Sequence, residues 1–98
     1  MDTEGKKIPR KKAVALGYMN GRDSAPRILA SGKGTIAEAI AEIARENGIP
    51  FYKDENLVES LINLRIDAEI PIELYEAIAH VLAYVYSLDI KEGGKIKN

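Results

Sequence analysis

The sequence predicts an α/β fold, in which a small mixed sheet of three to four short strands is flanked by three or more helices. Short apolar runs bounded by turn-forming residues are typical of strands, and longer stretches with apolar residues every three or four positions are typical of helices. The chain has 98 residues, of which 46% are hydrophobic and 30% charged. These values are typical of one folded domain with a single core.

Two strands are expected near the beginning of the chain. Ala13–Tyr18 is a short apolar run, and Pro26 can open a second strand, Arg27–Ala30, because a first strand residue can lack a donor. The residues 20–24 between them are loop formers. A third strand is expected at Ile49–Tyr52. If it is parallel to the second strand, the two strands and the helix between them form a right-handed βαβ unit.

The clearest helix signal covers Thr35–Asn47. Thr35 and Glu38 have the spacing of a capping box, and Gly48 stands where a left-handed C-cap is wanted. An apolar stripe at helical spacing predicts the face that packs on the sheet. Its members are Ile36, Ala37, Ile40, Ile43 and Ala44.

Two further helices are expected in the second half of the chain. Asp54 can cap a helix with Leu57, Val58, Leu61 and Ile62 on one side. Pro71 is well placed as the first residue of the last helix, which should reach about Leu88. The apolar stripe of that helix comprises Leu74, Ile78, Val81, Leu82 and Val85. The residues 65–70 between the two helices break the helical pattern.

The charge distribution divides the chain into three parts. Residues 1–11 are expected to form a flexible basic N-terminal arm, 12–89 a single domain, and 90–98 a flexible tail. No segment has the apolar core of a signal peptide, and none approaches the roughly 20 apolar residues of a membrane span. We therefore expect a cytoplasmic protein without a membrane span.

The sequence offers little catalytic chemistry. The absence of cysteine excludes disulfides and thiolate sites, and His80 is the only histidine, so no histidine pair can hold a metal. Lys33 lies between two glycines but lacks the spacing of a phosphate-binding loop. The glutamates of the predicted helices lie mostly away from the apolar stripes, as on solvated faces. We predict no catalytic site, no metal, no cofactor and no small-molecule substrate.

Several segments together resemble a known family. They are Ala13–Tyr18, Asp23–Pro26, Ile43–Pro50 and Glu69–Tyr86, and in this order and spacing they resemble the cytoplasmic C-terminal domain of the FlhB/YscU family of type III secretion export-gate proteins. The resemblance runs from about Pro9 to Leu88. It implies a role in flagellar protein export, with rod- and hook-type export substrates and export-gate proteins as partners at the membrane export apparatus.

The resemblance also implies which family features this chain lacks. Family members cleave themselves between Asn and Pro in an Asn-Pro-Thr-His motif, where this chain has Ile8, Pro9, Arg10 and Lys11. Ile8 has no side-chain nitrogen to attack its own carbonyl carbon, so we expect a free-standing FlhB-like module that does not cleave itself. The strand before the motif is largely absent, which leaves a possible pairing edge on the sheet.

In the family, substrates are thought to dock in a shallow apolar pocket, and its residue types recur here at Ala25, Pro26, Ala79 and Leu82. The alternative is that Ala79 and Leu82 face the core and that Ala25 and Pro26 form an ordinary turn. A different function would be nucleic-acid binding through the cations of Lys6–Lys12. The strands offer no interleaved aromatic residues for base stacking, which argues against it. A third possibility is an inert paralogue kept for assembly.

Overall fold

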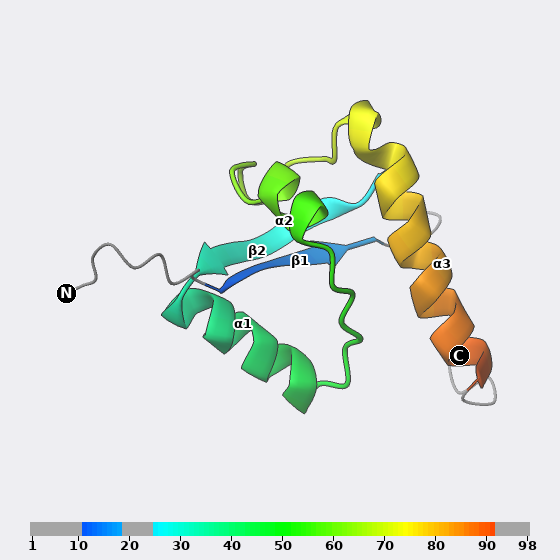
Figure 1. The fold of residues 1–98 in the computed structure, drawn as a ribbon, viewed down its shortest axis with the longest axis horizontal. Helices are drawn as coiled ribbons and strands as arrows, with labels where there is room; N and C mark the ends of the chain where they lie inside the picture. Colours follow the sequence, from blue (N-terminus) through cyan, green and yellow to red (C-terminus); the bar gives the residue numbers. More distant parts are fainter. Residues whose placement is uncertain (1–10, 19–24, 92–98) are drawn as a thin grey trace.

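The computed structural model describes residues 11–18 and 25–91. Its elements are β1 (Lys12–Gly17), β2 (Arg27–Lys33), α1 (Thr35–Glu46), α2 (Glu55–Leu61), the 3-10 turn η1 (Ile72–Leu74) and α3 (Tyr75–Lys91). The two strands lie between α1 and α2, and α3 stands beside one end of them (Figure 1). The α/β class and the three helices are confirmed. Most of the predicted arm 1–11 and the loop 20–24 lie outside the described residues. The predicted tail 90–98 starts too early, because α3 continues to Lys91.

β1 and β2 form an antiparallel pair. Val14 lies opposite Ser31 and Ala15 opposite Ala30, and a bulge then shifts the register so that Leu16 lies opposite Ile28. Side chains alternate between the two faces of a strand. The pair therefore presents Val14, Leu16 and Ile28 to one face, and mainly alanine and glycine to the other.

The predicted strand at 49–52 is wrong, because these residues have no ladder partner in the described part of the chain. The segment 67–70, predicted only as a connector, pairs with β2 instead. The Ile28 N–H donates to the Ala68 carbonyl (3.1 Å), and the Ile70 N–H donates to the Pro26 carbonyl (3.1 Å). The described sheet thus has two strands and one bridge, Arg27 to Glu69, rather than three or four strands.

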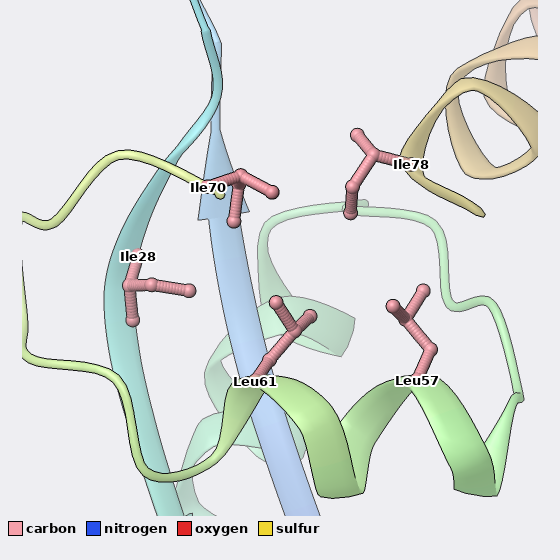
Figure 2. Close-up of a cluster of buried hydrophobic side chains, with 5 residues drawn as sticks. All are labelled: Ile28, Leu57, Leu61, Ile70 and Ile78. Atoms are coloured by element: carbon pink, nitrogen blue, oxygen red, sulfur yellow. The ribbon is translucent and has the colours of Figure 1, made fainter. Parts of the chain in front are cut away.

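The core lies on the face of the strands that α2 covers. Its buried side chains are Ile28, Leu57, Leu61, Ile70 and Ile78, which converge from β2, α2, the 67–70 segment and α3 (Figure 2). Ile28 is fully buried, and Val14 and Leu16 of β1 pack against the cluster. Of the four residues expected on the inner side of α2, Leu57 and Leu61 are confirmed as buried, whereas Val58 and Ile62 are only half-buried.

α1 packs on the opposite face, and its predicted stripe is only partly correct. Ala37 is buried, but Ile36 and Ile43 are exposed by 58% and 57%. The sheet beneath carries small residues, and a Cβ at Gly32 would lie 2.7 Å from the Ile36 Cβ. Ile36 therefore lies against Gly32 and leaves no room for a side chain there, although most of its own surface is exposed.

The helix ends follow the sequence signals in two cases out of four. Pro71, expected as the first residue of the last helix, instead precedes the 3-10 turn η1, and α3 begins at Tyr75. The Asp54 carboxylate accepts from the Leu57 N–H (3.1 Å), and Gly48 has a φ of 68°, as predicted for an N-cap and a left-handed C-cap. The capping box is wrong: Gly34, at φ 60°, is the N-cap of α1, and no side-chain cap forms. The Gly34 N–H also donates to the Lys11 carbonyl, so Gly34 continues the pairing with the beginning of β1 and at the same time starts α1.

Candidate protein-binding surface

Ala25 and Pro26, half of the predicted pocket, lie inside the fold. Ala25 is 2% exposed and Pro26 is also buried, immediately before β2 begins. The Pro26 carbonyl is fixed by its hydrogen bond from Ile70. This pair is therefore held rigidly by the 67–70 segment, and it offers little surface of its own to a partner.

Ala79 and Leu82, the other half, lie on the exposed side of α3. Leu82 is 39% exposed and Ala79 is exposed as well, whereas Ile78 is buried and Val81 packs against the core cluster. The alternative that Ala79 and Leu82 face the core is therefore wrong for the described structure. The sequence placed Leu82 in the same stripe as Ile78, but Leu82 lies one turn further along α3, at the margin of the buried face, and is exposed.

The exposed side of α3 carries an apolar stripe, which we call the outer stripe: Tyr75, Ala79, Leu82 and Tyr86. The spacing of four, three and four residues brings them to one face of a helix. All four are exposed, and Tyr86 reaches 68%. The inner positions Leu74, Ile78 and Val81 hold α3 to the core. α3 therefore has an apolar side that the described chain does not cover, with the small Ala79 between Tyr75 and Leu82.

A second group of exposed apolar side chains lies between α1 and α2. Ile49, Phe51 and Tyr52 are exposed by 39% to 53%. The Tyr52 ring meets the Tyr84 ring of α3 edge-on, with centroids 5.3 Å apart. Contiguous exposed apolar area of this kind marks interaction sites in soluble domains more often than isolated residues do.

Charged contacts brace the sheet on both sides. The Arg27 guanidinium donates to the Asp67 carbonyl (3.1 Å) and lies 3.3 Å from the Glu69 carboxylate, which ties β2 to the 67–70 segment. On the other strand, the Lys12 ammonium pairs with Glu59 of α2. The hydrogen bond and the charge of Lys12 hold the pKa of the Glu59 carboxyl below its ordinary value, with a small contribution from Lys33.

The other predicted chemistry can be placed only in part. His80 is exposed on α3, as expected of a surface histidine. Within residues 11–18 and 25–91, no group of three His, Asp or Glu side chains is placed to hold a metal ion, and no helix could span a membrane. Of the altered cleavage motif, Ile8, Pro9 and Arg10 lie outside the described residues. The carbonyl of Lys11 accepts a hydrogen bond from Gly34.

Two features of this surface were not predicted from the sequence. The outer stripe was missed because Leu82 was assigned to the core stripe, although the exposed spacing Tyr75, Ala79, Leu82, Tyr86 is visible in the sequence. The pairing of 67–70 was missed too. Its signal is weak: the short alternation Ala68-Glu69-Ile70 before Pro71.

Solved structures place this arrangement in a defined class of proteins, the C-terminal cytoplasmic domains of export-gate proteins. The cytoplasmic domain of FlhB from Shewanella putrefaciens superposes with a TM-score of 0.80 at 35% identity, over 86% of this chain and 67% of that one. The PscU C-terminal domain superposes with a TM-score of 0.74 at 28% identity, over 79% of this chain and 99% of that one.

Sequence relatives agree with the structural ones. The family model described as the FlhB HrpN YscU SpaS family matches residues 8–85, and the chain belongs to that family. The flagellar biosynthetic protein FlhB of Yersinia enterocolitica is 41% identical over 91 residues, which are 90% of this chain and 24% of that protein. The protein YlqH of Bacillus subtilis is 43% identical over 81 residues, which are 83% of this chain and 87% of that protein. The chain thus spans about a quarter of the FlhB of Yersinia enterocolitica but most of YlqH.

Proposed function

We propose that this domain is a non-catalytic binding module of flagellar type III protein export, which binds rod- and hook-type export substrates and export-gate proteins in the cytoplasm. The observation that carries the proposal is the outer stripe of α3, an exposed apolar face on a helix anchored to the core by Ile78. Family membership supports the export context, because the relatives with comparable sequences include flagellar biosynthetic proteins.

The proposed contact is centred on Ala79 and Leu82. Ala79 is the small residue of this surface, and Leu82, Tyr75 and Tyr86 are the larger apolar side chains beside it. Full burial of a leucine-sized side chain contributes about 1.5–3 kcal/mol, so a few contacts give weak and reversible binding. Ala25 and Pro26 remain part of the proposed site as a buried support near the core. Reversible binding suits a module that passes substrates on.

The binding test is an NMR titration of the labelled full chain with a hook-type export substrate. We expect shifts centred on Ala79 and Leu82, and Leu82→Asp should weaken binding about tenfold or more because it places a charge in the apolar contact. His80→Asp is the matched control, since it adds the same charge one residue from Ala79 but off the outer stripe. Equal affinities of Leu82→Asp, Ala79→Asp and the unmodified chain would contradict the site.

The lack of self-cleavage is a separate part of the proposal. In the family that this chain resembles, an asparagine side chain attacks its own carbonyl carbon, and Ile8 has no side-chain nitrogen for that attack. Mass spectrometry of the full chain, incubated for days at neutral pH, should show one intact mass. Fragments ending at Ile8 and starting at Pro9 would overturn this part and leave the binding proposal standing.

A further inference from the structure

The outer edge of β1 carries backbone groups that point away from β2. The Gly34 N–H donates to the Lys11 carbonyl (2.8 Å), and this bond fixes the alternation of the ladder. Ala13 and Ala15 therefore bond to β2, while the N–H and C=O groups of Lys12, Val14 and Leu16 are directed outward. Among the described residues, these outward groups have no backbone partner.

Among residues 11–18 and 25–91, nothing gives this edge the usual protection against strand pairing. Proteins shield edge strands with proline, bulges, inward charges or a covering segment. β1 contains no proline, and the bulge of the pair lies in β2 at Leu29. Its one charged residue, Lys12, is at the end of the strand and is held by Glu59. The corresponding edge of β2 is covered by the 67–70 segment, so the two edges differ.

The neighbouring segment 50–53 has no backbone partner either. The Ile49 N–H bonds to the end of α1 at Ala44, but the described part of the chain gives Phe51, Tyr52 and Lys53 no backbone bond. Figures 1 and 2 both place the connection from α1 to α2 on the side of β1 away from β2. Unpaired backbone and exposed apolar side chains thus occur on the same side of the molecule.

We propose that the edge of β1 is a strand-addition site for an extended segment of an export-gate partner protein, apolar at alternate positions and acidic at one end. This inference rests on the proposed function for the identity of the partner. An added strand would lie about 4.8 Å from β1 and bond to Lys12, Val14 and Leu16. Directly opposite residues share a face, so its apolar side chains would extend the row of Val14 and Leu16.

Charge favours this occupant over a second copy of the chain. Lys11, Lys12 and Lys33 gather at the beginning of β1, where Lys12 lies opposite Lys33 in the register. Antiparallel pairing of two β1 strands about Val14 would set Lys12 opposite Leu16 of the second copy, and no carboxylate of that strand would reach the basic end. An acidic residue on an incoming strand complements the charges there.

The test measures amide hydrogen exchange of the full chain by NMR. In the free protein, the N–H groups of Lys12, Val14 and Leu16 should exchange fast, and those of Ala13 and Ala15 slowly. The first probe is the synthetic peptide Thr-Val-Thr-Val-Thr-Val-Glu-Glu, whose glutamates reach the basic end in antiparallel pairing. At saturation it should slow the three outward amides about tenfold or more. The same peptide with methylated valine nitrogens should not.

Two variants separate the backbone bond from side-chain packing. Val14→Pro removes the outward N–H, and edge strands tolerate proline there. Val14→Ala keeps the N–H and loses comparable packing. We expect Val14→Pro to bind the peptide about fivefold or more weakly than Val14→Ala, since the proline removes one bond and obstructs the edge. Thermal unfolding of both variants checks that they are folded. Equal affinities would overturn strand addition.

The second probe is the cytoplasmic domain of an FlhB-type gate protein. Slowed exchange at the β1 edge supports the whole proposal. Binding that spares these amides but is lost in Leu82→Asp overturns strand addition and keeps the proposed function. If only the peptide slows these amides, strand addition at the β1 edge is supported, but the export-gate protein as its partner is overturned. Three outcomes overturn the proposal outright. The first is that neither probe slows the outward amides, and the second is that these amides already exchange slowly in the free monomer. The third is that their exchange slows only as the chain forms dimers.

Discussion

The two outer edges of the β1–β2 pair are completed differently. Beyond β2, the chain supplies its own covering segment, with three backbone bonds between residues 26–28 and 67–70 and the Arg27 contacts across them. Beyond β1, the described residues supply none, and exposed apolar side chains lie there instead. The side of β2 is therefore closed by the chain itself, and we call it the closed side; the side of β1 is uncovered in the described part of the chain, and we call it the open side.

Shortening a side chain should lower the free energy of unfolding most on the closed side. Ile28 is fully buried, with α2, α3 and the 67–70 segment around it. We expect Ile28→Ala to lower the free energy of unfolding by about 2–5 kcal/mol through lost burial and a cavity. Ile43→Ala makes the same chemical change at an exposed position and should cost less than about 1 kcal/mol. Urea unfolding measures both free energies, and similar losses for the two variants would contradict the prediction that the closed side carries more of the stability.

The packing of α1 gives the next largest effect. A methyl group at Gly32 would overlap the Cγ2 of Ile36, and the Cβ of Ile36 would lie 2.7 Å away. We expect Gly32→Ala to cost about 1–3 kcal/mol by overpacking. Gly48→Ala tests a glycine with open space but a φ of 68°, so its cost should come from the backbone alone, at about 1 kcal/mol. Ile36→Ala removes the Cγ2 but keeps the Cβ, so if it partly rescued Gly32→Ala but not Gly48→Ala in urea unfolding, the cause would be established as steric.

Much of the closed side could be predicted from the sequence, because its signals are local. Asp54 caps α2, Gly48 ends α1, and Leu57, Leu61 and Ile78 are buried as their spacing indicates. A cap or a helical stripe depends on residues within a few positions of one another. Such interactions are visible in the sequence without knowledge of the tertiary fold.

The failures concern contacts between distant segments. Residues 49–52 have strand composition but no partner to pair with, whereas 67–70 pair with β2 despite a connector-like sequence. Strand formation requires a neighbouring strand, which a local pattern does not specify. The exposure of Ile36 and Leu82 likewise depends on which elements pack against α1 and α3, which helical spacing alone does not specify.

The backbone of Asp67, in the turn that leads into the pairing with β2, is mildly strained. Asp67 has a φ of 72°, its N–H donates to the Ile28 carbonyl (2.6 Å), and its carbonyl accepts from Arg27. A non-glycine residue in this region costs about 1 kcal/mol. Asp67→Gly should therefore raise the free energy of unfolding, measured in urea, by up to about 1 kcal/mol, and Asp67→Val should lower it. A loss with glycine would show that the aspartate side chain stabilises the turn.

The smallest effect belongs to the open side, at the Lys12–Glu59 pair. Because Lys12 lowers the pKa of Glu59 from its ordinary 4.5, the folded state binds this proton less tightly than the unfolded state. The contribution of the pair is therefore present above pH 4.5 and is lost as the pH falls through the lowered pKa. NMR titration should show the pKa of Glu59 rising in Lys12→Met. The difference should shrink in high salt, because the pair is exposed.

The same NMR titration of Glu59 tests how a strand is oriented at the β1 edge. A strand bound at β1 with its glutamates beside Lys12 would compete for the ammonium and add negative charge near Glu59. Both effects favour the protonated form, so the pKa of Glu59 should rise when the acidic peptide binds. A matched peptide ending in two glutamines should leave it unchanged. If both peptides slow the β1 amides but neither moves the pKa, the strand adds in another direction and the charge argument for its orientation fails.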